Sequence, residues 1–149
     1  MATIRLPPDF KEFLRLLEGN EVEYLLIGGY AVGFHGYPRA TVDMDIWVAT
    51  TPDNAPRVVT VLKEFGFDVP ELSPELFLTE DQVIRMGMPP VRLEILTSIS
   101  GVTFEECYAE RVVGELDGVP VNLISLRHLK LNKRASGRNK DLNDLENLA

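Results

Sequence analysis

Apolar residues recur every three or four positions in several stretches of this chain, which is the spacing of helices that bury one face. The clearest stripe, Phe10, Phe13, Leu14 and Leu17, begins after Pro7-Pro8-Asp9 and stops at Gly19. Five further helices are predicted: residues 29–35, the stretch between Thr51-Pro52 and Gly66, residues 103–109, a helix capped by Ser125 that runs through Leu129 to Arg134, and a final helix after Gly137 that carries Leu142, Leu145 and Leu148.

Other stretches carry the short apolar runs and the period-two alternation of strands. The predicted strands are residues 21–27, 43–48, 83–86, 91–96, 111–116 and 119–124. Gly87-Met88-Pro89-Pro90 and Asp117-Gly118 separate the last four strands into two pairs, and Asp-Gly is a strong hairpin signal. Residues 67–80 read as a loop with a short turn. This mixed order predicts an α+β fold in which helices pack on a mixed sheet.

The most informative segment joins a Gly-Gly turn to a strand with two carboxylates. Leu26-Ile27 leads into Gly28-Gly29, and Asp43 and Asp45 follow on the next strand. Alternate side chains of a strand share a face, so these two aspartates point one way and Val42, Met44 and Ile46 point the other. Paired carboxylates favour a hard divalent cation such as Mg²⁺. The Gly-Gly turn can present unobstructed N–H groups to an anion.

A third carboxylate, Glu94, lies within the otherwise apolar strand 91–96. A buried carboxylate needs a partner or a metal ion, so Glu94 would join Asp43 and Asp45 if the two strands were neighbours. The alternative is that Glu94 lies on an edge strand and pairs with Arg92, which shares its face. An isolated Asp-x-Asp pair is also more often a solvated strand face than a metal site.

Length, charge and composition argue against several classes of protein. The 149 residues predict one domain spanning 1–149. A net charge of −8 argues against broad non-specific binding to nucleic acid. The single Cys107 excludes an intrachain disulfide framework and fits a reducing compartment. Residues 1–10 lack a signal-peptide core, and the longest apolar run, 24–34, is too short and glycine-rich to span a bilayer. We therefore expect a cytoplasmic protein with no membrane partner.

These motifs together resemble the DNA polymerase beta-like nucleotidyltransferase superfamily. Its domains share a strand, a Gly-Gly or Gly-Ser turn, a helix, an Asp-x-Asp strand and a later carboxylate, which Gly28-Gly29, Asp43, Asp45 and Glu94 match. The chain looks most similar to the minimal prokaryotic branch that includes abortive-infection toxin nucleotidyltransferases. Two segments carry that similarity: the Arg-x-Thr-x-Asp-x-Asp run that begins at Arg39 and Thr41, and the basic run from Lys133 to Asp141. Glu94 departs from the more common Asp, and Gly29 from the more common Ser.

The resemblance implies a Mg²⁺-dependent enzyme, with Mn²⁺ as an alternative ion, that transfers NMP from an NTP to an acceptor hydroxyl. Asp43, Asp45 and Glu94 would be both catalytic residues and metal ligands. The nucleotide-binding residues would be Gly28, Gly29, Arg39, Thr41 and Lys133. The acceptor stays open between a tRNA, a protein and a small molecule, and a homodimer is one alternative for the oligomeric state.

A basic cluster near the C-terminus stands out in this acidic chain. Lys130, Lys133 and Arg134 share a helix face that could clamp phosphates. The alternative is that these cations are solvated or pair with the acids that follow. The roles of Arg134, Arg138, Lys140, Asp141 and Asp144 stay open, although by resemblance one aspartate would orient a lysine or act as a base.

A second hypothesis comes from a different functional class. A small acidic domain offers little surface for a polymeric acceptor. The chain could therefore be a catalytically silent module that binds a nucleotide or a protein partner, such as a cognate antitoxin in a toxin–antitoxin type system. The intact set of Asp43, Asp45 and Glu94 argues against loss of catalysis.

Overall fold

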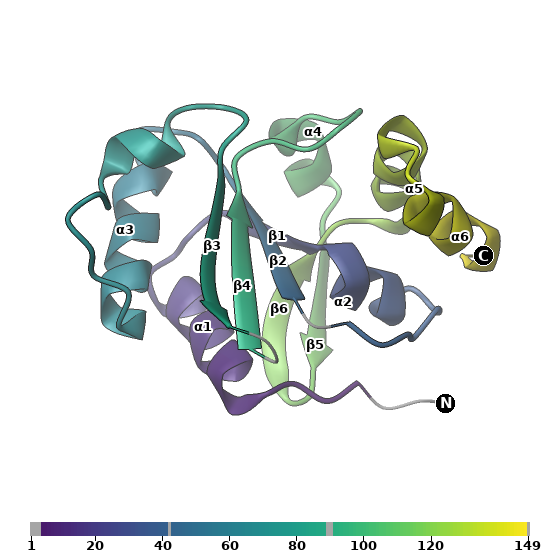
Figure 1. Ribbon diagram of the computed structural model, residues 1–149, viewed down its shortest axis with the longest axis horizontal. Coiled ribbons are helices and arrows are strands. Elements are labelled where there is room, and N and C mark those ends of the chain that lie inside the picture. The colour runs from purple at the N-terminus through teal and green to yellow at the C-terminus, as the bar shows by residue number, and fades with distance from the viewer. Residues whose placement is uncertain (1–3, 42, 89–90, 149) are drawn as a thin grey trace.

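A mixed six-stranded sheet forms the centre of the protein (Figure 1). The computed structural model describes residues 4–41, 43–88 and 91–148. The strand order is β3-β4-β2-β1-β6-β5, in which β2 runs parallel to β4 and β1 parallel to β6, while the other neighbours are antiparallel. The strands are β1 (Tyr24–Ile27), β2 (Asp43–Val48), β3 (Val83–Met88), β4 (Val91–Leu96), β5 (Val112–Leu116) and β6 (Val119–Leu123).

Helices cover the sheet in two groups. On the left of Figure 1, α1 and α3 pack on each other, and the apolar stripe of α1 faces the sheet. On the right, α2 packs on β1 and β2, and α5 and α6 pack on each other. The bounds are α1 (Pro8–Gly19), α2 (Gly28–Phe34), α3 (Asn54–Phe65), α4 (Phe104–Ala109), α5 (Leu126–Ser136) and α6 (Asn139–Asn147), with a 3-10 turn, η1 (Pro74–Phe77).

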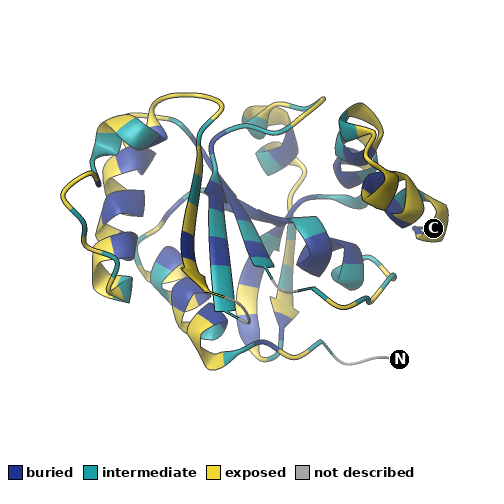
Figure 2. Ribbon diagram, in the orientation of Figure 1, coloured by how far each residue is buried: buried dark blue, intermediate teal, exposed yellow. Residues whose placement is uncertain are grey.

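The core follows from the burial of the two central strands. All four residues of β1 are buried, as expected for a strand covered on both faces. In β2, Met44 and Ile46 are fully buried whereas Asp43 and Asp45 are partly exposed, so the predicted alternation is confirmed for these residues. Figure 2 shows the buried sides of α1 and α3 turned toward the sheet. Val42, predicted to point with Met44, and the Pro89-Pro90 turn lie outside the described residues.

Most predicted elements form, because their local start and stop residues act as expected. Asp117 and Gly118 have positive φ angles of 48° and 81° and close the β5–β6 hairpin. Ser125 caps α5 by accepting a hydrogen bond from the His128 backbone N–H. The first predicted strand is shorter than expected. It begins at Tyr24, because Glu21 lies in a turn with a φ of 55°.

The last helix forms, but its leucines are only part of its buried face. Leu148 is buried and Leu145 half-buried, whereas Leu142 is exposed, and the buried residues within α6 are Asp141 and Asp144. The two aspartates can be buried because Lys133 on α5 and Arg39 in the loop before β2 neutralise them. No helix in the described part of the chain is long and apolar enough to cross a membrane.

Candidate functional site

The sheet topology brings the three predicted carboxylates to one place. β4 lies beside β2, with Asp43 opposite Arg92 and Asp45 opposite Glu94. Neighbours in register share a face, so Asp43, Asp45 and Glu94 point into the same cavity of about 830 Å³. The remaining predicted site residues also line this cavity: Gly28, Gly29, Arg39, Thr41 and Lys133.

The Gly-Gly turn is required by the close approach of its neighbours. Gly28 has a φ of 69°, and a Cβ atom there would overlap the Oδ2 atom of Asp45. A Cβ on Gly29 would lie 2.5 Å from the Oγ1 atom of Thr41. Any side chain at either position would therefore push the turn away from the Asp-x-Asp strand. The geometry explains why this turn needs two glycines.

Asp45 is the most perturbed carboxylate of the site. Burial raises its pKa to about 7, and the negative charges of Glu94 and Asp43 act in the same direction, with Lys140 opposing them. Within the described residues, its buried Oδ1 atom has no hydrogen-bond partner. An unsatisfied buried carboxylate oxygen is costly, so Asp45 is primed to accept a proton or a cation.

Arginine side chains hold the other two carboxylates. Arg92 donates from Nε and from a terminal nitrogen to the two oxygens of Asp43, at 2.9 and 2.8 Å. Arg85, on β3, donates from Nε to Oε1 of Glu94 at 2.9 Å. The sequence alternative paired Glu94 with Arg92, but the strand register gives Arg92 to Asp43 instead.

The donor chemistry of these residues fits Mg²⁺, although the carboxylates do not form a ready-made cage. Nowhere in residues 4–41, 43–88 and 91–148 do three or more His, Cys, Asp or Glu side chains form a group that could hold a metal ion. Mg²⁺ does not need such a cage, because it usually keeps several waters and takes one or two carboxylates plus phosphate oxygens. The unpartnered Asp45 oxygen and the adjacent Asp43 carboxylate, whose oxygens also accept from Arg92, would be the donors of that minimal set.

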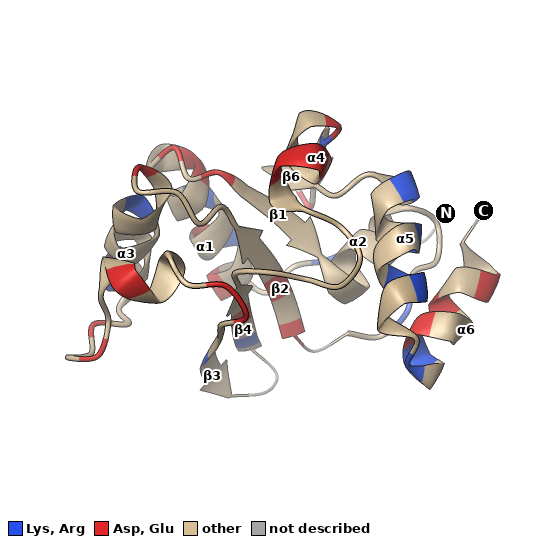
Figure 3. Ribbon diagram, turned by 90° about the horizontal axis from the view of Figure 1, so that it is seen from above, with Lys and Arg blue, Asp and Glu red and all other residues tan. Residues whose placement is uncertain are grey.

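The opposite wall of the cavity is basic and comes from the C-terminal helices. Figure 3 shows acidic residues at the end of β2 and basic residues along α5. Lys133 projects from α5, is buried, and donates to Asp141 at 3.0 Å, and its Nζ atom lies 3.1 Å from Asp144. Arg138 and Lys140 also line the cavity. Arg134 is exposed and does not line it.

Asp141 and Asp144 are fully buried and fully paired. Burial alone would raise the pKa of Asp141, but hydrogen bonds from Arg138, Ser136 and Lys133 outweigh it and hold the pKa well below its usual range. The pKa of Asp144 is likewise lowered, because Arg39 and Lys133 more than offset the cost of its burial. Both groups are therefore charged at neutral pH.

Arg39 ties this cluster to the Gly-Gly turn. Its Nε and one terminal nitrogen donate to both oxygens of Asp144, at 2.8 and 3.0 Å, across 105 residues of sequence. The other terminal nitrogen reaches the backbone oxygen of Ala40. The nucleotide-binding role of Arg39 stays a prediction. In the described chain its guanidinium anchors α6 to the loop that leads into β2.

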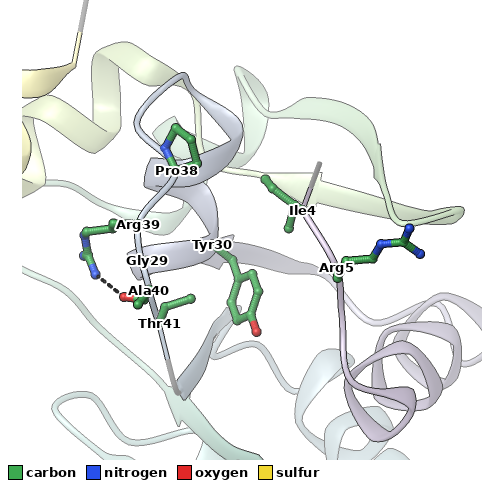
Figure 4. A pocket seen from close by; sticks show the side chains of 9 residues that line it. Ile4, Arg5, Gly29, Tyr30, Pro38, Arg39, Ala40 and Thr41 are labelled. Atoms are coloured by element: carbon green, nitrogen blue, oxygen red, sulfur yellow. Dashed lines mark hydrogen bonds between the residues drawn. The ribbon is translucent and has the colours of Figure 1, made fainter. Parts of the chain in front are cut away.

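A second, smaller cavity of about 390 Å³ lies against the same loop (Figure 4). Gly29, Arg39, Ala40 and Thr41 line both cavities, so this loop forms a shared wall. Tyr30 borders the smaller cavity, and Figure 4 shows Arg39 hydrogen-bonded to the backbone of Ala40.

Sequence reasoning missed two features of this site. Arg85 was not singled out, although the predicted pairing of strands 83–86 and 91–96 placed it on the strand beside Glu94. Burial of Lys133 was missed because lysines on an amphipathic helix are normally exposed. The carboxylates that follow, Asp141 and Asp144, were the available clue.

Comparison with known proteins supports the fold. No protein-family profile matches the sequence, and no curated protein is similar enough to match it. A crystal structure of a provisionally assigned nucleotidyltransferase from Thermotoga maritima is similar, with a TM-score of 0.65 and 14% identity, over 96% of this chain and 94% of that chain. An antigenic nucleotidyltransferase-like protein from Paracoccidioides brasiliensis has a TM-score of 0.52 and 21% identity, over 92% of this chain and 72% of that chain. The chain therefore has the nucleotidyltransferase-like α+β fold that its sequence predicts.

Proposed function

We propose that this protein is a nucleotidyltransferase that moves NMP from an NTP to an acceptor hydroxyl. The observation that carries the proposal is a single cavity with three carboxylates on one wall and Lys133, Arg138 and Lys140 on the other. Such a cavity can hold an anionic triphosphate together with a divalent cation. The general class also agrees with the two nucleotidyltransferase-like structures of similar fold.

The chemistry follows from the charge arrangement. The acceptor oxygen would form a bond to the α-phosphorus, and the bond from that phosphorus to the bridging oxygen would break. Pyrophosphate would leave with the electron pair, and Glu94 would help to remove the hydroxyl proton. Lys133 would neutralise charge on the phosphates, held in place by Asp141 and Asp144. Gly28, Gly29 and Thr41 would form the cradle beside the triphosphate, and Arg39 would support that cradle through Asp144.

Asp43 and Asp45, completed by Glu94, would hold Mg²⁺ or Mn²⁺. When bound, the ion would neutralise the triphosphate and polarise the reacting phosphoryl group. The acceptor is proposed to be a hydroxyl of a tRNA, a protein or a small molecule. Pairing with an antitoxin protein, a cytoplasmic location and a homodimer are further proposals of the same hypothesis.

A thermal-shift titration tests the proposal without knowledge of the acceptor. Each NTP, as a non-hydrolysable analogue with Mg²⁺, is titrated against the wild type, Asp45→Asn and the exposed-site control Asp68→Asn. Ligand at about 100 times its dissociation constant stabilises the native state by about 2.7 kcal/mol. We expect a Mg²⁺-dependent rise in unfolding temperature in the wild type and in Asp68→Asn, but not in Asp45→Asn. Equal shifts in all three proteins would contradict the proposed site.

One observation favours the alternative of a catalytically silent binding module. Both oxygens of Asp43 are engaged by Arg92, and one oxygen of Glu94 by Arg85. A protein that binds a nucleotide without a cation would keep these pairs. In the same titration, a shift of equal size with Mg²⁺ and with a chelator would support this module over the enzyme.

A further inference from the structure

Arg92 is paired with both oxygens of Asp43, a predicted metal ligand. Its guanidinium donates to them at 2.9 and 2.8 Å, so each oxygen accepts one hydrogen bond. A guanidinium and a divalent cation are both positive and would compete for the same lone pairs. A cation that binds at Asp43 would therefore compete with Arg92, although each oxygen still has a second lone pair.

The Arg92–Asp43 ion pair can separate at a low cost in free energy. The side chains keep 36% and 24% of their exposure, whereas Asp144, paired with Arg39, keeps 1%. Exposed ion pairs contribute little net stability, because water solvates the separated charges almost as well. Both side chains already contact solvent while they are paired, so water can solvate each charge when the pair opens.

If the Arg92 side chain separates from Asp43, it already lies where it could bind an anion. It lines the same cavity as Gly28 and Lys133, one strand away from the Asp-x-Asp pair. The planar fork of a guanidinium matches a phosphate as well as it matches a carboxylate. The triphosphate can therefore replace Asp43 as the partner of Arg92.

We propose that Arg92 is an exchangeable counter-ion, which neutralises Asp43 in the free protein and passes to the triphosphate when a divalent cation takes Asp43. This inference rests on the proposed nucleotidyltransferase function. It makes Arg92 a coupling residue: the cation frees the arginine, and the triphosphate gives that arginine a new partner. Cation and triphosphate then bind cooperatively, and the free chain binds the cation weakly.

Binding of Mn²⁺ alone, followed by the electron paramagnetic resonance signal of free Mn²⁺, tests this exchange. We compare the wild type with Arg92→Gln, Arg92→Lys, Asp45→Asn and the control Arg57→Gln, whose arginine is exposed and donates to the Glu21 backbone. Arg92→Gln should bind Mn²⁺ about 10-fold more tightly than the wild type, and Arg92→Lys by an intermediate factor, because a lysine makes only a point contact. Arg57→Gln should match the wild type.

The failures of the inference and of the proposed function differ in this experiment. If Arg92→Gln binds Mn²⁺ no more tightly than the wild type while Asp45→Asn loses binding, the cation site stands and the exchange is wrong. If Asp45→Asn binds as well as the wild type, the proposed cation site itself is wrong. A second measurement uses the unfolding temperature without metal. A loss of several degrees in Arg92→Gln would show that the pair is a structural contact, and would overturn the exchange.

Discussion

Both walls of the cavity contain carboxylates that pair with cations, but the pairs differ in burial and in completeness. On the C-terminal helices, Asp141 and Asp144 are fully buried, and Lys133, Arg39 and Arg138 pair with them. On the sheet, Asp43 and Glu94 are partly exposed and each has an arginine, while the buried oxygen of Asp45 has no partner among the described residues. The first cluster is complete without a ligand. The second is not, because one buried oxygen of Asp45 has no hydrogen-bond partner in the described part of the chain, so a ligand would complete the sheet wall.

This difference indicates that one wall supports the site and that ligands would bind at the other. A buried network whose members are all paired resists exchange, because removal of any member leaves an uncompensated charge. A half-exposed network with an unpartnered oxygen can exchange partners. The helix cluster therefore positions Lys133, and the carboxylate wall is where a cation and a substrate would enter.

The largest effect is expected from the helix cluster. Lys133→Met should lower the free energy of unfolding by about 3–5 kcal/mol, because it leaves Asp141 and Asp144 buried together without their shared cation. Urea unfolding measures this effect. The control Arg134→Met, at an exposed position of the same helix, should change stability by less than about 0.5 kcal/mol. A loss of similar size in both variants would argue against a special role for the buried pair.

Gly28→Ala should have the next largest effect. The added Cβ would overlap Asp45, and the positive φ angle is unfavourable for alanine, so we expect a loss of about 2–3 kcal/mol. The thermal shift with nucleotide analogue should disappear as well. Gly19→Ala is the matched control, because a Cβ there meets nothing within 4 Å, and it should be neutral or slightly stabilising. Unchanged stability and unchanged binding in Gly28→Ala would show that the close approach is not needed.

Asp45→Asn should raise the free energy of unfolding, whereas the two substitutions above lower it. The raised pKa of Asp45, about 7 when folded, means that the folded chain binds more protons than the unfolded chain between about pH 4 and pH 7. Stability contributed by this group is therefore present at low pH and lost as the pH rises through 7. The asparagine variant does not have this pH-dependent loss. The difference in free energy of unfolding between Asp45→Asn and the wild type should therefore grow by about 2 kcal/mol, in favour of the variant, between pH 5 and pH 8.

Urea titrations of both proteins at the two pH values measure this difference, with Asp68→Asn as the control. A constant difference between wild type and Asp45→Asn would contradict the perturbed carboxylate. A more stable protein that has lost its ligand shift would be a direct sign that stability is sacrificed at this position for function.

The smallest effect is expected at the link between the two walls. Arg39→Lys keeps the charge but loses the two-point contact with Asp144, so we expect a loss of about 1 kcal/mol. The same unfolding assay measures it. Combined with Lys133→Met, the change should be non-additive, because both side chains share Asp144. Strict additivity would show that Arg39 and Lys133 act independently.

The sequence by itself determined most of the elements and singled out candidate site residues. Helical spacing, turn residues and strand alternation are local properties, which is why β2, the Asp117-Gly118 hairpin and the Ser125 cap are where they were predicted. The eight predicted site residues line one cavity, and strand alternation put the carboxylates on one face, but only the neighbouring positions of β2 and β4 brought Glu94 to the two aspartates. The roles of these residues as ligands stay predictions.

Only the tertiary structure determined which charged side chains pair with each other. The pairing of Arg92 with Asp43, of Arg85 with Glu94 and of Arg39 with Asp144 depends on strand order and helix docking. The buried face of α6 shows the same limit, because its two aspartates are buried although the leucine spacing gave no sign of it. An ionised side chain can be buried only where opposite charge from distant parts of the chain meets it. That condition involves the whole fold and cannot be derived from local pattern.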